Sequence, residues 1–171
     1  ALTQSIARKL SARLKGSVQV ELAMSYGRPS ISAAVDRLLA NNCRRLLLLP
    51  LYPQYSSTTT ASVFAAVNAD LCRRRWIPEL RFINHYHDNR SYIAALAASV
   101  RNFRSRHGSG DLLLFSFHGI PRDSLDKGDP YHCECRKTAR LLAEALQLGE
   151  DNYIVTFQSR FGKAKWLEPY T

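Results

Sequence analysis

The feature that most constrains the fold is an apolar run at residues 112–117, which ends on His118. The run is too short for a useful helix and shows no alternation, so it predicts a strand buried on both faces, as in a parallel sheet. Gly119 and Pro121 then break the strand directly after the histidine. His118 is therefore expected at the carboxyl end of a strand, where open α/β sheets place their ligands.

The rest of the chain alternates between amphipathic helical segments and short apolar or β-branched segments. With Ser30 as a helix cap and Gly16 as a helix end, helices are expected at 2–15, after residue 30, from about 60 to 75, at 89–106 and at 135–146. Strands are expected at 18–24, 45–51, 80–83, 112–117 and 152–157. This order predicts an α/β protein in which helices cover both faces of a parallel sheet.

The chain is strongly basic, with 24 Lys and Arg against 14 Asp and Glu and a net charge of +10. Such a charge is compatible with nucleic acid, anionic lipid or an acidic small molecule, and equally with a solubilising surface. The basic residues are scattered, without interleaved aromatic residues or zinc-finger spacing. A nucleic-acid-binding module is therefore the alternative from another functional class, and no nucleic-acid partner is expected.

No apolar stretch approaches the ~18 residues that span a bilayer. At most peripheral membrane contact and a cytoplasmic location are therefore expected. The four cysteines then predict free thiols, with Cys43 and Cys72 as small core residues. A metal site at Cys133 and Cys135 is disfavoured, because C-x-C at a helix start sends the sulfurs to opposite faces and no second pair completes four ligands. Solvated positions are expected for the histidines other than His118, namely His85, His87, His107 and His132.

Polar and aromatic residues cluster where several of the predicted strands end. The clusters are Tyr26, residues 52–58, His118 and residues 158–160. The carboxyl ends of parallel strands lie along one edge of a sheet, so these clusters are placed to share one crevice.

Four motifs in this order resemble those of ferrochelatases. They are Leu-Tyr-Pro-Gln-Tyr-Ser at 51–56, Ser-Phe-His-Gly-Ile-Pro at 116–121, Gly-Asp-Pro-Tyr at 128–131, and Phe-Gln-Ser-Arg-Phe-Gly at 157–162 with Trp166-Leu167. The resemblance covers essentially the whole chain. It implies a lyase that inserts ferrous iron into protoporphyrin IX in the last step of protohaem synthesis.

The resemblance also implies the architecture: two Rossmann-like halves with a porphyrin cleft between them, here 1–88 and 89–171, and no organic cofactor. Both halves are then incomplete. A first strand and a porphyrin-covering loop would precede Ala1, and further strands carrying a glutamate that faces the histidine would follow Thr171. We therefore expect the isolated chain to be inactive and to self-associate through unpaired sheet edges.

Five residues match functional positions of the family. His118 matches the catalytic histidine, and a neutral imidazole can both ligate Fe²⁺ and accept a pyrrole proton, so both roles stay open. Tyr26 matches a position on the metal-entry side. Ser159 and Arg160 match a loop near the porphyrin propionates. Trp166 matches a pocket tryptophan that would form an apolar wall for the macrocycle, and the alternative is an ordinary core residue.

Two further possibilities can be weighed on the residues at 56–58. Animal ferrochelatases take a [2Fe–2S] ligand from the matching stretch, which contains no cysteine here, so a cluster is not supported. These hydroxyl residues could bind an anion at a helix N-terminus, although helix capping is favoured.

The nearest alternative enzyme is a related chelatase that loads cobalt or iron into another tetrapyrrole such as sirohydrochlorin. The motifs at 52–55 and 158–162 argue against this alternative.

Overall fold

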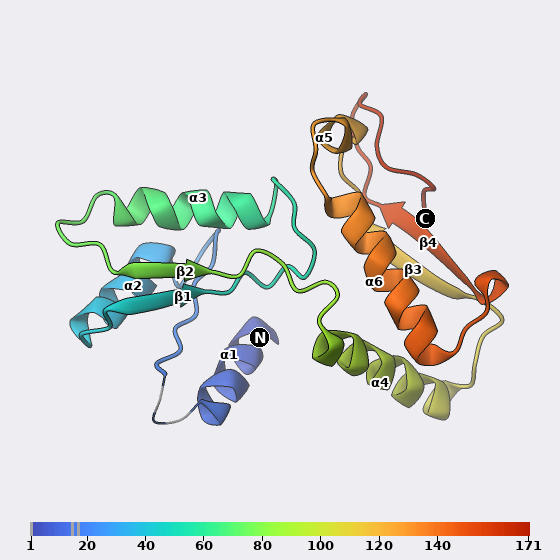
Figure 1. Ribbon diagram of the computed structural model, residues 1–171, viewed down its shortest axis with the longest axis horizontal. Helices are drawn as coiled ribbons and strands as arrows, with labels where there is room; N and C mark the ends of the chain where they lie inside the picture. The colour runs from blue at the N-terminus through green and yellow to red at the C-terminus, as the bar shows by residue number, and fades with distance from the viewer. Residues whose placement is uncertain (1, 15, 17) are drawn as a thin grey trace. The chain divides into compact units, whose positions relative to one another are not determined.

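The computed structural model describes residues 2–14, 16 and 18–171 and is shown in Figure 1. Its Cα positions form two compact units. Unit 1 contains Ala1–Pro50 and Ala61–Ile83, and unit 2 contains Leu51–Thr60 and Asn84–Thr171. Each unit is described by itself. The division at residue 88 inferred from the family resemblance stays a prediction.

Unit 1 is a small α/β arrangement around one parallel strand pair. Strands β1 and β2 run parallel with Leu46 opposite Leu80, and the buried core joins side chains of α2 and α3 (Val35, Val67 and Leu71). The elements are α1 (Leu2–Arg13), α2 (Ile31–Ala40), β1 (Arg45–Leu48), α3 (Thr60–Leu71) and β2 (Glu79–Phe82).

Local sequence signals account for the ends of the helices in both units. The Ser30 hydroxyl accepts a hydrogen bond from the amide of Ala33 at 3.2 Å, which confirms the predicted N-cap of α2. Asn89 caps α4 in the same way, accepting from the amides of Ser91 and Tyr92. Caps of this kind satisfy amides that have no partner within the helix.

The strand predicted at 18–24 is wrong. This segment contains one isolated bridge, from Met24 to Ser30, and Val18 is 54% exposed. Apolar residues become a strand only where a second strand takes up their backbone groups, and this segment has no such strand among the residues described. Helix α1 ends at Arg13 rather than residue 15, which lies outside the described residues.

Unit 2 contains the strand that leads to His118. Its strands β3 and β4 pair in parallel, with Phe115 opposite Val155, and helices α4 and α6 pack against each other. Phe157, Cys135 and Ala139 lie at the centre of its core. The elements are α4 (Arg90–His107), β3 (Leu113–His118), α5 (Arg122–Asp126), α6 (Tyr131–Leu146), the short 3₁₀ helix η1 (Glu150–Asn152) and β4 (Tyr153–Gln158).

The parallel α/β architecture agrees with the sequence-based prediction, but the prediction that β3 is buried on both faces is wrong. Phe115 is buried, whereas Leu114 is 46% exposed, so burial alternates along the strand. Ile154, which lies opposite Leu114 on β4, is 40% exposed. The pleat sends alternate side chains to opposite faces. The face of Leu114 and Ile154 is thus only partly covered within unit 2, since Thr156 on the same face of β4 is buried and contacts Thr171.

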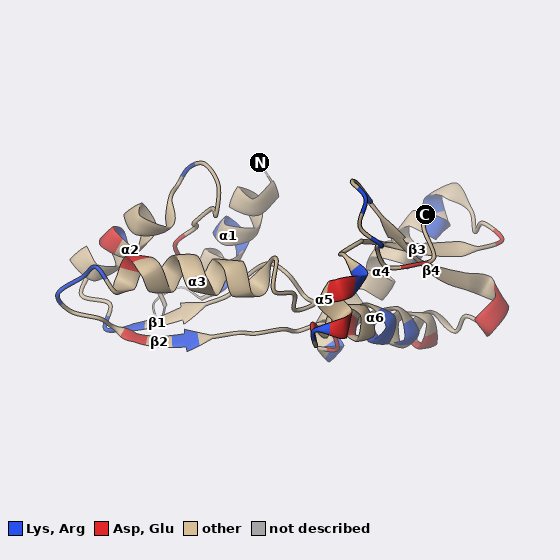
Figure 2. Ribbon diagram, turned by 90° about the horizontal axis from the view of Figure 1, so that it is seen from above, with Lys and Arg blue, Asp and Glu red and all other residues tan. Residues whose placement is uncertain are grey.

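The surface charge and the helix lengths bear on possible partners. Lys and Arg occur on several helices and loops of both units, interspersed with Asp and Glu (Figure 2), as the scattered pattern in the sequence indicates. Across the residues described, we find no helix with the length and apolar character needed to cross a membrane.

Candidate functional site

His118 is the last residue of β3 and lies opposite Gln158, the last residue of β4. Its side chain is exposed. The ring nitrogen Nδ1 lies 2.7 Å from the carbonyl oxygen of Gly119. A carbonyl oxygen can only accept, so Nδ1 carries a proton and donates it to this bond. In the neutral ring, Nε2 is then left with a free lone pair for a ligand.

The turn after His118 requires glycine because other atoms approach its Cα closely. The amide of Gly119 donates to the carbonyl oxygen of Gln158 at 2.8 Å. A Cβ on Gly119 would lie 2.9 Å from that same oxygen and 3.2 Å from Cε3 of Trp166. The position of the imidazole therefore depends on a backbone contact between β3 and β4 that only glycine allows.

Trp166 packs beneath this turn. It is 7% exposed, and its Nε1 donates to the carbonyl oxygen of Phe161 at 3.0 Å. An antiparallel bridge joins it to Pro121, and the next residue, Leu167, donates to the carbonyl oxygen of Ile120. Within unit 2 the indole therefore acts as a support for the His118 turn.

The predicted anion-binding residues follow β4 directly. Ser159 and Arg160 are exposed, and Ser159 has a left-handed backbone with φ of 69°. The Arg160 guanidinium lies over the ring of Tyr170, 4.4 Å from its centroid, a cation–π contact that orients its donors. Because Gln158 lies opposite His118, these residues begin beside the histidine.

Tyr26 belongs to the other unit. Its side chain is 89% exposed in unit 1. A hollow of about 720 Å³ lies next to it, lined by Gly27, Arg28 and Pro29 among others. The structure thus assembles His118, Trp166 and residues 159–160 within unit 2, while Tyr26 is not among them.

Two of the sequence motifs are joined by a buried carboxylate. Asp129 accepts hydrogen bonds from the Ser56 hydroxyl at 3.0 Å and from the Ser57 amide at 2.7 Å. Its other oxygen accepts from the Tyr131 amide at 3.0 Å. The hydroxyl-rich stretch before α3 therefore already holds a negative group of the chain itself, so it offers no free site for an external anion.

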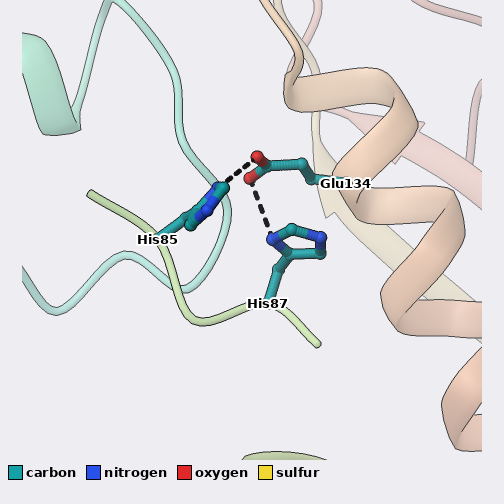
Figure 3. A group of neighbouring side chains, drawn as sticks. All are labelled: His85, His87 and Glu134. Atoms are coloured by element: carbon teal, nitrogen blue, oxygen red, sulfur yellow. Dashed lines mark hydrogen bonds and ion pairs between the residues drawn. The ribbon is translucent and has the colours of Figure 1, made fainter. Parts of the chain in front are cut away.

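A second buried carboxylate, Glu134, lies close to the side chains of two histidines (Figure 3). Its Oε2 accepts from the Tyr55 amide at 2.7 Å, and its Oε1 lies 2.6 Å from Nδ1 of His85. His87 Nδ1 lies 3.3 Å from Oε2 without an aligned hydrogen bond. Burial lowers the pKa of His87, against the opposing effect of the Glu134 charge.

The sequence analysis missed this cluster. The prediction that His87 is solvated is wrong, since it is 5% exposed, whereas His107 is exposed as expected. The available signal was the His-x-His spacing of His85 and His87, which places two imidazoles near each other in the chain. That spacing says nothing of the helix that contributes Glu134.

The cysteines behave largely as predicted. All four are free thiols. Cys133 is exposed and Cys135 is buried, which confirms that the C-x-C sulfurs diverge, and burial raises the pKa of Cys135 to about 12. The prediction of a core position is wrong for Cys72, which is exposed.

Comparisons with known proteins bear on the whole chain. The model of the ferrochelatase family matches residues 1–171. The chain is 53% identical to the ferrochelatase of Idiomarina loihiensis over 173 residues, covering 99% of this chain and 48% of that protein. It is 60% identical to that of a Polaromonas species over 155 residues, covering 91% and 42%. The chain therefore spans about half the length of the curated relatives it matches.

Proposed function

The chain belongs to the ferrochelatase family, and on that premise we propose that it provides the histidine-bearing part of an enzyme that inserts ferrous iron into protoporphyrin IX. Fe²⁺ and the porphyrin are then the substrates, and protohaem is the product. No organic cofactor belongs to this proposal, as the family resemblance implies. A [2Fe–2S] cluster is not proposed, because the stretch at 56–58 has no cysteine.

The observation that carries the proposal is the tautomer of the exposed His118 ring, in which Nδ1 carries the proton and Nε2 has a free lone pair. Insertion removes two pyrrole protons and delivers a divalent ion to the macrocycle. An exposed Nε2 lone pair, fixed by the Nδ1 bond to the Gly119 carbonyl, is suited to accept a proton or to ligate the metal. Both roles remain part of the proposal.

Ser159, Arg160 and Trp166, which lie near His118 in unit 2, and Tyr26 of unit 1 also have proposed roles in binding the substrates. Ser159 and Arg160 would bind the porphyrin propionates, since a hydroxyl and a guanidinium both donate to carboxylates. Trp166 would support the apolar wall of the pocket through its packing under the histidine turn. The exposed phenol of Tyr26 would act on the metal-entry side.

The proposed location is the cytoplasm. Four free cysteines and no disulfide among them suit a reducing compartment. Fractionation of cells that express the natural gene would test this, and recovery from a secreted or periplasmic fraction would contradict it.

The activity is best tested in a chimera. Residues 1–171 would replace the matching segment of the Idiomarina loihiensis ferrochelatase, and zinc insertion into a soluble porphyrin would be followed by fluorescence. We expect the chimera to insert metal. His118→Ala should lower kcat by at least about 100-fold, the usual scale for loss of a proton-transferring group, with porphyrin affinity largely unchanged.

A matched control keeps the test specific. His107→Ala removes an exposed histidine of the same unit and should leave turnover unchanged. Wild-type turnover by the His118→Ala chimera would overturn the proposal. Insertion into sirohydrochlorin in preference to protoporphyrin would favour the related chelatase instead. The 171-residue chain alone is expected to show no insertion, because productive geometry needs groups on both sides of the macrocycle.

A further inference from the structure

Two histidines and a glutamate that are not among the residues assigned to iron insertion converge near the start of α6 (Figure 3). His85 and His87 come from the loop before α4, and Glu134 comes from the first turn of α6. One possible ligand atom from each residue lies within 4.8 Å of the others. We propose that these three side chains bind a divalent transition-metal ion, such as Zn²⁺, at a site separate from His118.

The donor set suits such an ion. Two imidazole nitrogens and one carboxylate oxygen form a three-ligand set that leaves a fourth position for water. At metal–ligand distances of about 2.0–2.2 Å, the donor atoms of a tetrahedral site lie about 3.3–3.6 Å apart. His87 Nδ1 and Glu134 Oε2 are 3.3 Å apart. This pair therefore already has the spacing that a shared ion requires.

The buried ring of His87 has a nitrogen atom, Nδ1, that lacks a bonding partner. Its ring is almost fully buried, at 5% exposed, and Nδ1 has no hydrogen-bond partner. A buried nitrogen that is stripped of water and left unbonded is unfavourable. Although Oε2 of Glu134 is nearby, the direction for a hydrogen bond is poor. An ion between the two atoms would give His87 Nδ1 the partner that it lacks.

His85 must move slightly to complete the set. Its Nδ1 lies 2.6 Å from Glu134 Oε1, a hydrogen-bond distance that would open by roughly 0.7 Å around a metal. The His85 side chain is 48% exposed and lies in a loop, so this shift is sterically open. The ion takes the place of the Nδ1 proton that His85 donates to Glu134, and in the neutral ring this proton moves by way of solvent to Nε2, which leaves the Nδ1 lone pair for the ion.

Neighbouring groups hold the other two ligands. The Tyr55 amide donates to Oε2 of Glu134 at 2.7 Å and fixes the carboxylate. The Thr138 hydroxyl lies 2.9 Å from the carbonyl oxygen of His87 and donates to it, which anchors the loop. Such outer contacts orient metal ligands and contribute to affinity. The site would therefore tie the segments at 55 and 85–87 to α6.

The test measures binding of Zn²⁺ alone to the 171-residue chain by calorimetry, with Co²⁺ absorption as a report on coordination. We expect one strong site per chain and a tetrahedral Co²⁺ spectrum. His85→Ala and Glu134→Gln should each weaken Zn²⁺ binding by ~10-fold or more. His118→Ala and His107→Ala should bind Zn²⁺ as the unsubstituted chain does.

Three outcomes would overturn the proposal: no strong Zn²⁺ site in the unsubstituted chain, unchanged binding in His85→Ala, or loss of the site in His118→Ala alone. The His85 side chain is about half exposed, so its replacement decides the matter even if Glu134→Gln fails to fold, which circular dichroism would show. The insertion assay is separate, because loss of turnover in His118→Ala leaves this Zn²⁺ measurement unaffected.

Discussion

Gly119 and Trp166 are packed so closely that a single added methyl group would reach the indole. A Cβ on Gly119 would stand 3.2 Å from Cε3 of Trp166, and 2.9 Å from the Gln158 carbonyl oxygen on its other side. The residue after His118 is thus confined between a buried ring and the backbone of β4. The geometry of the histidine and the packing of the tryptophan are therefore one structural unit.

The first prediction is that Gly119→Ala destabilises the chain. The close atom at Gln158 belongs to the backbone and cannot rotate away, so the expected loss is about 1–3 kcal/mol, as for overpacked cores. Urea unfolding measures it. Gly110→Ala is the matched control, because its nearest neighbour, the Leu112 carbonyl oxygen, lies at 4.0 Å. Equal midpoints for the two variants would contradict the prediction.

A second prediction concerns the buried carboxylate of Asp129. Asp129→Asn keeps the shape but removes the charge that the Ser56 hydroxyl and Ser57 amide donate to. The expected loss is about 1.5–3 kcal/mol, the scale for hydrogen bonds to a charged group, together with faster hydrogen exchange at the Ser57 amide. The control is Asp123→Asn, whose ion pair with Lys127 is exposed and should not matter. Slow exchange at Ser57 in the Asp129 variant would count against this role.

The third prediction is an acid-sensitive contact in unit 1. Burial alone would raise the pKa of Asp70, but the hydrogen bond and charge of Arg74 outweigh it and hold this pKa below 3.8. The unfolded chain therefore binds the proton more readily than the folded chain. The stability from this pair is fully present above about pH 4 and is lost as the pH falls through the lower, folded-state pKa.

Thermal unfolding measured between neutral pH and about pH 2 would test this linkage. Asp70→Asn should be less stable at neutral pH, and its stability should fall less steeply below about pH 4. Asp111→Asn, at an exposed position, should follow the unsubstituted chain. Parallel curves for the Asp70 variant and the unsubstituted chain would show that the ion pair is not the source.

A fourth prediction concerns the exposed part of the face that Leu114 and Ile154 share on β3 and β4. Leu114 and Ile154 lie opposite each other, 46% and 40% exposed. Exposed apolar faces of this kind promote association. We expect the chain to self-associate and the double variant Leu114→Thr with Ile154→Thr to do so less, as measured by light scattering. Ile77→Thr, an exposed apolar position of unit 1, is the control. Association unchanged by the double variant would place the contact elsewhere.

Much of the fold could be predicted from local sequence. The hydrophobic periodicity indicates α4 and α6, Ser30 and Asn89 mark the starts of helices, and Gly119 with Pro121 ends β3 after His118. These features depend on residues that are near neighbours in the chain. Periodicity, capping and turn geometry act over a few residues, so they can be read without knowledge of the tertiary structure.

The tertiary structure decided which of these local features acquire partners. Residues 18–24 pair with no second strand among the residues described, and Leu114 is exposed. His87 is buried against Glu134, which lies 47 positions later in the sequence. Burial and pairing depend on atoms from distant segments, and a carboxylate on α6 can meet an imidazole in a loop only after both have packed. The sequence by itself therefore determined most of the helices and strands and the place of His118, whereas long-range packing left residues 18–24 out of any sheet and created the cluster at Glu134.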